Sequence, residues 1–208
     1  MKKIMFNDKY GLTQAVLNGR KTMTRRIAIP ATEKEITLCN INKDWYEDEE
    51  SNVYIPKYQV GEVVAIAQSY MDVDRFHRKG KNAAYLDYLD SMLPDMKKLP
   101  GWHNKMFVKA ALMPYHIHIT DIKVERLQDI SEEDCEKEGI QYLGLEYEHY
   151  GDPMYSFESS DTYYTCAKDA FSRLIDKISG KGTWERNPFV FAYSFKRIDN
   201  VKQEIKQI

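Results

Sequence analysis

The chain has 208 residues, of which 43% are hydrophobic and 30% are charged, and its formal net charge is −2. A chain of this length and apolar content can bury a real core, and its small net charge excludes a uniformly basic nucleic-acid binder. No stretch of the sequence approaches the roughly 18 consecutive apolar residues that a membrane-spanning helix needs.

The charges are unevenly distributed along the chain. Residues 1–26 hold four lysines and three arginines against one aspartate, whereas residues 121–161 hold thirteen acidic residues against three basic ones. A chain with one basic end and one acidic segment can present a local phosphate site. The alternative is that both faces are solvated and neutralise each other across the fold.

The cysteines indicate a reducing compartment. Cys39, Cys135 and Cys166 are odd in number and contain no close pair, which argues against a disulfide framework and against a CxxC metal site. The start, "MKKIMFNDKYG", does not fit a secretory signal. We therefore expect a cytoplasmic protein with reduced thiols and without a cofactor.

The first half of the chain predicts one helix and several strands. "YGLTQAVLNG" (10–19) has helical spacing and ends on a glycine suited to a helix C-terminus. "EITLCNIN" (35–42) predicts a strand, and "KDWYEDEES" (43–51) predicts an acidic surface loop. "YQVGEVVAIAQSY" (58–70) predicts a turn followed by a strand, and residues 82–98 predict a helix.

The second half predicts two long strands separated by helices. "YHIHITDIKVERLQDI" (115–130) alternates apolar and polar residues, as a half-buried strand does. "SEEDCEKEG" (131–139) predicts a short helix capped by its serine. Residues 140–160 predict a tyrosine-rich loop or hairpin. Residues 161–180 predict a longer helix with Asp161 as N-cap, and 187–198 predict the last strand.

This order of elements predicts the fold class. The strands are too scattered and too closely linked for a doubly wound sheet, so we expect an α+β fold, a small mixed β-barrel with peripheral helices. Residues 1–208 are expected to form a single domain.

Four segments carry a resemblance to a known family. They are "VLNGRKTMTRR", "YQVGEVV", "ITDIKVERLQDISEEDCEKEGI" and "KGTWERNPFVFAYSFKRI", in this order along the chain. Together they resemble the ASCH family of the PUA-like superfamily, and more closely its prophage-associated bacterial members. The resemblance covers about half of the residues, and the stretches near 43–57, 71–100 and 141–165 look like insertions.

The resemblance implies a compact PUA-like barrel with a cleft that binds RNA or a nucleotide. One small bacterial branch of the family is an amidohydrolase that removes the acetyl group from N4-acetylcytidine. The Lys, Thr and Glu of that branch match Lys21, Thr24 and Glu138 here. The chain departs from the family where a basic residue and Glu-Thr-Trp are usual, because it reads "AQSY", with Gln68 in place of the Glu and Tyr70 at the end.

Amide hydrolysis would give these three residues distinct roles. Thr24 is the candidate nucleophile, Lys21 the base and Glu138 the proton carrier, since a hydroxyl attacks only when a base lies within hydrogen-bond reach. Lysine can act as a base only if burial or nearby cations lower its pKa. Lys21 and Thr24 meet if the chain bends between them and point to opposite faces if it forms a straight strand.

The same motif also supports binding without catalysis, which we take as the first expectation. Arg20, Lys21, Arg25 and Arg26 would contact phosphates, and Tyr70 would stack on a base of RNA or of a modified nucleoside. The amidohydrolase is the second expectation, so the sequence leaves open whether the chain is an enzyme.

A third expectation is a prophage protein-interaction module that uses the tyrosine-rich stretch 140–165. His116 and His118 share one face of a strand, but no third ligand has a recognisable spacing, so no metal site is expected. The sequence does not indicate an oligomeric state.

Overall fold

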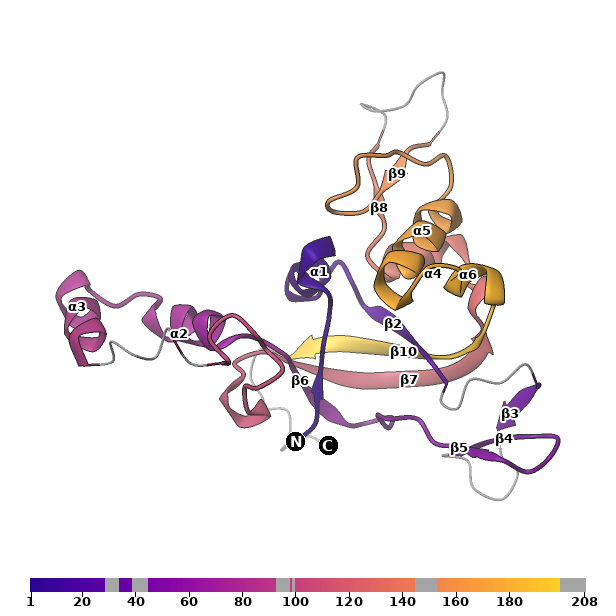
Figure 1. Cartoon of the computed structure of the whole chain (residues 1–208), viewed down its shortest axis with the longest axis horizontal. Coiled ribbons are helices and arrows are strands. Elements are labelled where there is room, and N and C mark those ends of the chain that lie inside the picture. The colour runs from indigo at the N-terminus through magenta and orange to yellow at the C-terminus, as the bar shows by residue number, and fades with distance from the viewer. Residues whose placement is uncertain (29–33, 39–44, 93–97, 99, 145–152, 199–208) are drawn as a thin grey trace. The chain divides into compact units, whose positions relative to one another are not determined.

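The computed structural model describes residues 1–28, 34–38, 45–92, 98, 100–144 and 153–198 (Figure 1). The contacts of the backbone divide the chain into two compact units. Unit 1 comprises Met1–Phe6, Val63–Ile117 and the segment from Ile198, and unit 2 comprises Asn7–Glu62 and His118–Arg197.

Unit 1 is built on a short pair of parallel strands. β1 (Lys3–Ile4) pairs with β6 (Val63–Ile66), and the first residues of β7 (His116–Arg126) lie on the other side of β6. The helices α2 (Tyr70–Arg78) and α3 (Ala83–Met92) and the turn η3 (Ala110–Leu112) follow. Small and medium apolar side chains fill the core, namely Ala65, Ala67, Val73, Val108 and Met113.

Unit 2 contains the strands that position the candidate site. The larger part of β7 lies beside β10 (Phe189–Ile198), and β10 pairs antiparallel with β2 (Met23–Ile27). β3 (Ile36–Leu38), β4 (Tyr46–Asp48) and β5 (Val53–Tyr54) form a separate antiparallel sheet. β8 (Gln141–Tyr142) pairs with β9 (Tyr155–Ser156).

The helices of unit 2 precede and follow these strands. η1 (Asp8–Tyr10) and α1 (Leu12–Leu17) lead into β2, and η4 (Leu127–Asp129) and α4 (Glu132–Lys137) follow β7. α5 (Ala167–Ser179) packs against α4, against β9 and against α6 (Thr183–Arg186), as Figure 1 shows. α5 buries Ala167, Ala170, Phe171, Leu174 and Ile175 on one stripe, which is the pattern of an amphipathic helix.

The mixed α+β class is confirmed. Within the described residues, each sheet is open and none closes into a barrel, so the barrel stays a prediction. Within that part of the chain, no helix combines the length and the apolar character that crossing a membrane requires.

Several predicted elements are confirmed. α1 ends just before Gly19, whose φ is +74°, and α4 begins after Ser131, whose side chain accepts a hydrogen bond from Asp134 N. The strand predicted at 115–130 is confirmed over His116–Arg126 as β7, whereas Leu127–Asp129 forms the 3-10 helix η4, and the strand predicted at 187–198 appears as β10. The predicted strand 35–42 is confirmed over Ile36–Leu38, and its remaining residues 39–42, with Cys39, lie outside the described residues.

Three predictions about local structure are wrong. Asp161 is not the N-cap of the long helix, because α5 begins at Ala167 with Cys166 as its cap. The acidic stretch 43–51 is not only a loop, since Tyr46–Asp48 is a strand whose tyrosine and aspartate are buried. Residues 58–70 were expected to end in strand, but Tyr70 begins helix α2 after a capping box formed by Ser69 and Asp72.

Candidate functional site

Lys21 is brought into the interior of unit 2 by the turn that follows α1. The backbone reverses at Gly19, and Lys21 N donates to Ala15 O at 2.9 Å, which holds the segment against the helix that it has just left. Glycine adopts the left-handed conformation at this turn without a steric penalty. The Lys21 side chain is therefore directed inward, and the residue is only 2% exposed.

Glu138 reaches the same place from the end of α4. It is the C-cap of that helix, and the following Gly139 has a φ of +110°. A Cβ atom on Gly139 would lie 3.1 Å from Leu12 Cδ2, so only glycine permits this approach of α4 to α1 without adjustment. Thr22 N also donates to Lys137 O at 3.0 Å, which ties the entry of β2 to the last turn of α4.

The two side chains form a direct buried pair. Lys21 Nζ lies 2.5 Å from Glu138 Oε2 and 2.6 Å from the Glu138 backbone oxygen. Burial lowers the pKa of the Lys21 amine, and this effect outweighs Glu138, which raises the pKa; Arg26 and Arg25 lower it further. The uncharged form of the amine is therefore easier to reach for Lys21 than for an exposed lysine.

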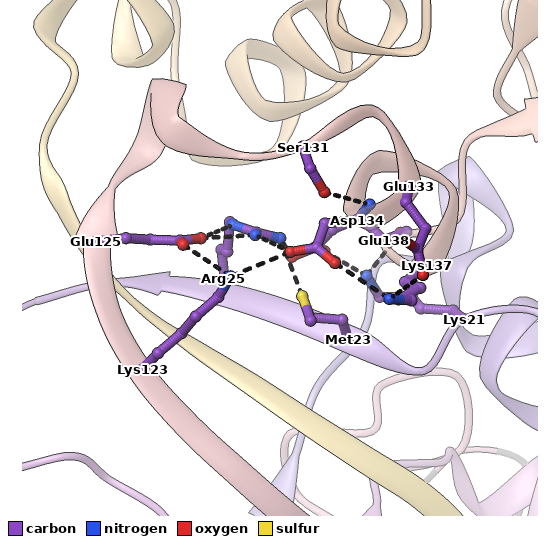
Figure 2. Close-up of polar contacts among 10 residues, drawn as sticks. All are labelled: Lys21, Met23, Arg25, Lys123, Glu125, Ser131, Glu133, Asp134, Lys137 and Glu138. Carbon is purple, nitrogen blue, oxygen red and sulfur yellow. Dashed lines mark hydrogen bonds and ion pairs between the residues drawn. The ribbon is translucent and has the colours of Figure 1, made fainter.

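Arg25 occupies the centre of a larger cluster of charges (Figure 2). Its guanidinium lies 2.6 Å from Glu125 Oε1, 3.0 Å from Asp134 Oδ2 and 3.2 Å from Glu138 Oε1. Burial lowers the pKa of Arg25, but Glu138 and Glu125 outweigh burial and raise it. Three carboxylates on two elements, β7 and α4, thus share one buried guanidinium.

Two lysines complete the cluster at its outer side. Lys123 Nζ lies 2.9 Å from Glu125 Oε2 and 3.2 Å from Asp134 Oδ2. Lys137 Nζ lies 3.3 Å from Asp134 Oδ1 and 2.7 Å from Glu133 Oε1. Burial raises the pKa of Asp134, but the hydrogen bonds from Lys123 and Arg25 outweigh it, and the net pKa is lowered.

Thr24 lies on the other face of β2 from Arg25. Successive side chains of a strand point to opposite faces, and Arg25 Nη1 contacts Met23 Sδ at 3.2 Å on one of them. Thr24 lies opposite Tyr193 of β10 in the strand register, so these two side chains share the second face. Thr24 is 4% exposed.

The second face of β2 is aromatic. The Tyr193 ring meets the Tyr58 ring edge-on at 5.4 Å, and the Tyr193 hydroxyl accepts a hydrogen bond from Lys57 N at 3.1 Å. Burial raises the pKa of Tyr193 to about 12, although Arg26 lowers it. Arg26 also lowers the pKa of Lys21, so it acts electrostatically on both the amine and this aromatic group.

The structure therefore brings together part of the predicted site. Lys21 and Glu138 meet, and Arg25 binds the same glutamate; Thr24 lies in the middle of β2, on the face opposite Arg25. Tyr70, which was predicted to stack on a base, belongs to unit 1, where it starts α2 and packs on that unit's apolar core.

The predicted phosphate contacts differ in their accessibility. Lys21 and Arg25 are 2% and 5% exposed and are paired with carboxylates, so neither presents a free cationic surface to a phosphate. Arg20 is exposed and Arg26 is half-buried. The arrangement is a buried ionic cluster with arginines beside it, instead of a basic patch of four side chains.

A hollow of about 460 Å³ opens beside the end of α4. Arg20, Lys137 and Tyr142 line it, together with Glu133, Glu136, Ile140 and Gln141. Arg20 Nη1 donates to Gly139 O at 3.2 Å, and the Gln141 amide, in the orientation that satisfies both of its atoms, accepts from the same guanidinium. This hollow offers a cation, an amide and an aromatic ring within one open space.

The histidines and cysteines of the sequence analysis do not form a further site in the described part of the chain. Within the described part of the chain, no three His, Cys, Asp or Glu residues are arranged as a metal site. Burial lowers the pKa of His116. Cys135 is buried, and burial raises the pKa of its thiol to about 12, so this thiol is a poor nucleophile.

Two carboxylates that bind Arg25 were not identified from the sequence, and neither were the outer lysines, Lys123 and Lys137. Glu125 lies in a strand where charges alternate with apolar residues, and Asp134 belongs to the capping sequence of α4. Each has an ordinary explanation as a surface or capping residue. The only available signal was the excess of acidic residues in 121–161 opposite the basic N-terminal segment.

Comparisons of the chain with models of protein families, with curated proteins and with solved structures gave no match.

Proposed function

We propose that this chain is an ASCH-type protein that recognises a modified nucleoside and hydrolyses the N4-acyl amide of a cytidine. The observation that carries the proposal is the contact of 2.5 Å between Lys21 Nζ and Glu138 Oε2 in a buried setting. A buried titratable group whose pKa is shifted and which has a specific charged partner, as Lys21 has in Glu138, is characteristic of functional sites. We also propose that the chain is a member of the ASCH family, that it has the PUA-like barrel of that family and that it is associated with a prophage, as the resemblance of its sequence motifs implies.

The chemistry follows from the roles of these groups. The neutral Lys21 amine takes the proton of the Thr24 hydroxyl as its oxygen attacks the acyl carbon. The bond between that carbon and the cytidine N4 then breaks, and Glu138 passes the proton that Lys21 has taken up to the leaving N4. Water then attacks the threonine ester. One of its protons reaches the Thr24 oxygen through the Lys21–Glu138 pair and the carboxylic acid is released, so the pair ends in its starting state.

The placement of Thr24 sets a condition on this reaction. Thr24 shares a face with Tyr193 instead of Arg25, so the substrate would enter along the aromatic face of β2. The reaction also requires the Thr24 hydroxyl to come within hydrogen-bond reach of the Lys21 amine, whose partner Glu138 is bound by Arg25 of the other face. Arg26 lies two residues from Thr24 in β2 and therefore on the same face, so in this proposal it is the cation that would stabilise the developing oxyanion.

Hydrolysis is favoured over binding along a phosphate backbone because of where the cations are. A polyanion is bound by accessible lysines and arginines that release counterions. Lys21 and Arg25 are instead neutralised inside unit 2, which suits a reaction with one small neutral ligand better than a row of phosphate contacts.

The test is the release of cytidine from N4-acetylcytidine by the full chain. We expect Lys21→Ala and Glu138→Gln each to lower the rate by about 100-fold or more, the range for loss of an acid–base group. Lys9→Ala, an exposed lysine of the same unit, is the matched control and should leave the rate unchanged. No release by the unaltered chain at high protein concentration excludes the hydrolase.

A second function, binding of RNA, is supported by the hollow beside α4. Arg20 and Tyr142 line this hollow and could hold a phosphate and a stacked base. Retention of labelled RNA should then weaken with salt, and Arg20→Ala and Lys137→Ala should each reduce it. Retention that depends on neither salt nor these two side chains would count against this function.

The interaction module remains as a third function. In the stretch 140–165, Tyr142 and Tyr163 are 47% and 54% exposed, whereas residues 145–152, with Tyr147 and Tyr150, lie outside the described residues. Exposed tyrosines are common at protein interfaces. Absence of both hydrolysis and RNA retention would favour this function.

A further inference from the structure

The central position of Arg25 is not explained by the roles given to Lys21, Thr24 and Glu138. Its side chain is 0% exposed, and its guanidinium contacts Glu125, Asp134 and Glu138 at once. Burying one charge is costly, and burying a cluster is tolerated only when nearly every donor and acceptor has a partner. A residue held in this way fixes the geometry of whatever it contacts.

We propose that Arg25 is a positioning residue for the Lys21–Glu138 pair, because its guanidinium holds Glu138 Oε1 and leaves Oε2 as the oxygen that contacts the amine. Arg25 Nη1 lies 3.2 Å from Glu138 Oε1, and Lys21 Nζ lies 2.5 Å from Oε2 (Figure 2). The two cations thus bind different oxygens of one carboxylate, which fixes the plane of that carboxylate relative to the amine.

The same contact controls the charge on the amine. A carboxylate that shares its negative charge with Arg25 stabilises the Lys21 ammonium less than a carboxylate facing Lys21 alone. Arg25 also repels that ammonium directly. Both effects favour the neutral amine, which is the form that can accept a proton.

The remaining charged groups around the amine come from three elements. β2 contributes Arg25 and Arg26, α4 contributes Glu138 with Asp134 and Lys137 behind it, and β7 contributes Glu125 and Lys123 through Arg25. Glu125 competes with Glu138 for the guanidinium, since it lies 2.6 Å from Arg25 Nη2. Removing Glu125 should therefore act in the opposite direction to removing Arg25.

Lysine cannot replace Arg25 in this position. The guanidinium is a planar fork with five donors, and Arg25 uses Nε, Nη1 and Nη2 in its contacts. An ammonium group keeps the charge but is a single point, so it cannot hold three carboxylates at the same time. Arg25→Lys thus separates the positioning role from the charge.

The first experiment measures the protonation of Lys21 directly in the full chain. The ¹³Cε chemical shift of Lys21 is followed against pH by NMR, and the signal is assigned by its absence in Lys21→Arg. We expect Arg25→Met to move the midpoint upward by about one pH unit and Glu125→Gln to move it downward. Arg126→Met, which removes an arginine of β7 outside the cluster, should leave the midpoint where it is.

The NMR outcome decides the proposal without any catalytic activity. Opposite shifts in Arg25→Met and Glu125→Gln support it, because general loosening of the fold would move both variants in the same direction. Equal midpoints in all variants overturn it. If Arg25→Met does not fold, Arg25→Lys and Glu125→Gln decide in its place, and a downward shift in Glu125→Gln is then the supporting result.

The second experiment concerns the catalytic consequence and rests on the proposed hydrolase. Arg25→Lys should lower kcat for N4-acetylcytidine about tenfold and leave KM within about twofold, since the pair is misaligned but the ligand is still bound. An unchanged kcat overturns the catalytic part of the proposal. Absence of cytidine release by the unaltered chain instead removes the hydrolase, while the NMR titration still tests the positioning role.

Discussion

The two faces of the buried strand β2 are stabilised by different kinds of interaction. One face carries Arg25 and is neutralised by carboxylates of β7 and α4, whereas the other carries Thr24 and packs with the aromatic Tyr193. The charged face depends on exact partners, and the aromatic face depends on contact area. Adjacent residues of one strand therefore differ in how strongly a substitution, or a change of pH, should affect them.

The largest difference is expected when the charged face loses its central residue. Arg25→Met leaves the carboxylates of Glu125, Asp134 and Glu138 without their shared cation, so we expect the free energy of unfolding to fall by about 3 to 5 kcal/mol. Urea denaturation followed by tryptophan fluorescence measures this change. Arg126→Met is the matched control, and a loss below about 1 kcal/mol for Arg25→Met would show that the cluster contributes little to stability.

The charged face should also be sensitive to acid. The pKa of Asp134 is lower in the folded chain than in the unfolded one, so its contribution is present above the unfolded value and is lost as the pH falls through the folded value. At neutral pH, Asp134→Asn should cost about 2 kcal/mol, the range for hydrogen bonds to charged groups. Between neutral and acidic pH, the free energy of unfolding should fall less for Asp134→Asn than for the unaltered chain. An equal fall in both would contradict the assignment.

The aromatic face should instead be sensitive to alkali. Burial raises the pKa of Tyr193 to about 12, against about 10 in an unfolded chain. Because the folded value is the higher one, stability from the neutral phenol is complete below the unfolded pKa and is lost as the pH rises toward the folded one. Absorbance of tyrosinate should show a component that ionises near pH 12 and that Tyr193→Phe removes.

The same substitution tests the hydrogen bond at this face. Tyr193→Phe leaves Lys57 N without the hydroxyl that it contacts at 3.1 Å, which should cost about 1 kcal/mol at neutral pH. Tyr163→Phe, an exposed tyrosine of the same unit, is the control. A cost equal to that of Arg25→Met would remove the distinction between the two faces.

The smallest effect is expected at the outer side of the cluster. The Lys123 side chain is 45% exposed, although it lies 2.9 Å from Glu125 Oε2. Solvent screens such a pair, so Lys123→Ala should lower the free energy of unfolding by about 0.5 kcal/mol. The loss should be smaller at high salt than at low salt, because dissolved ions screen an exposed ion pair. A loss close to that of Arg25→Met would show that Lys123 is as important as the buried partner.

Local patterns of the sequence were sufficient where neighbours in the chain decide the outcome. The end of α1 at Gly19, the cap of α4 at Ser131 and the strand β10 depend on residues within one turn or one alternation. The N-cap of α5 was misplaced because Asp161 is a better cap by residue type than Cys166. Glu132 supplies what Cys166 lacks, since its Oε2 accepts from Ala167 N at 2.7 Å, and this contact joins residues far apart in the sequence.

By itself, the sequence determined that a basic segment follows the first helix and that an acidic segment begins in the long strand. The resemblance of its motifs to the ASCH family suggested Lys21 and Glu138 as residues to compare. Only the tertiary structure decided that their side chains touch, that Arg25 binds the same carboxylate, and that Thr24 faces Tyr193. The physical reason is that charge and hydrogen-bonding capacity are properties of single residues. Burial, the choice of partner and the resulting pKa depend on which distant elements fold against each other.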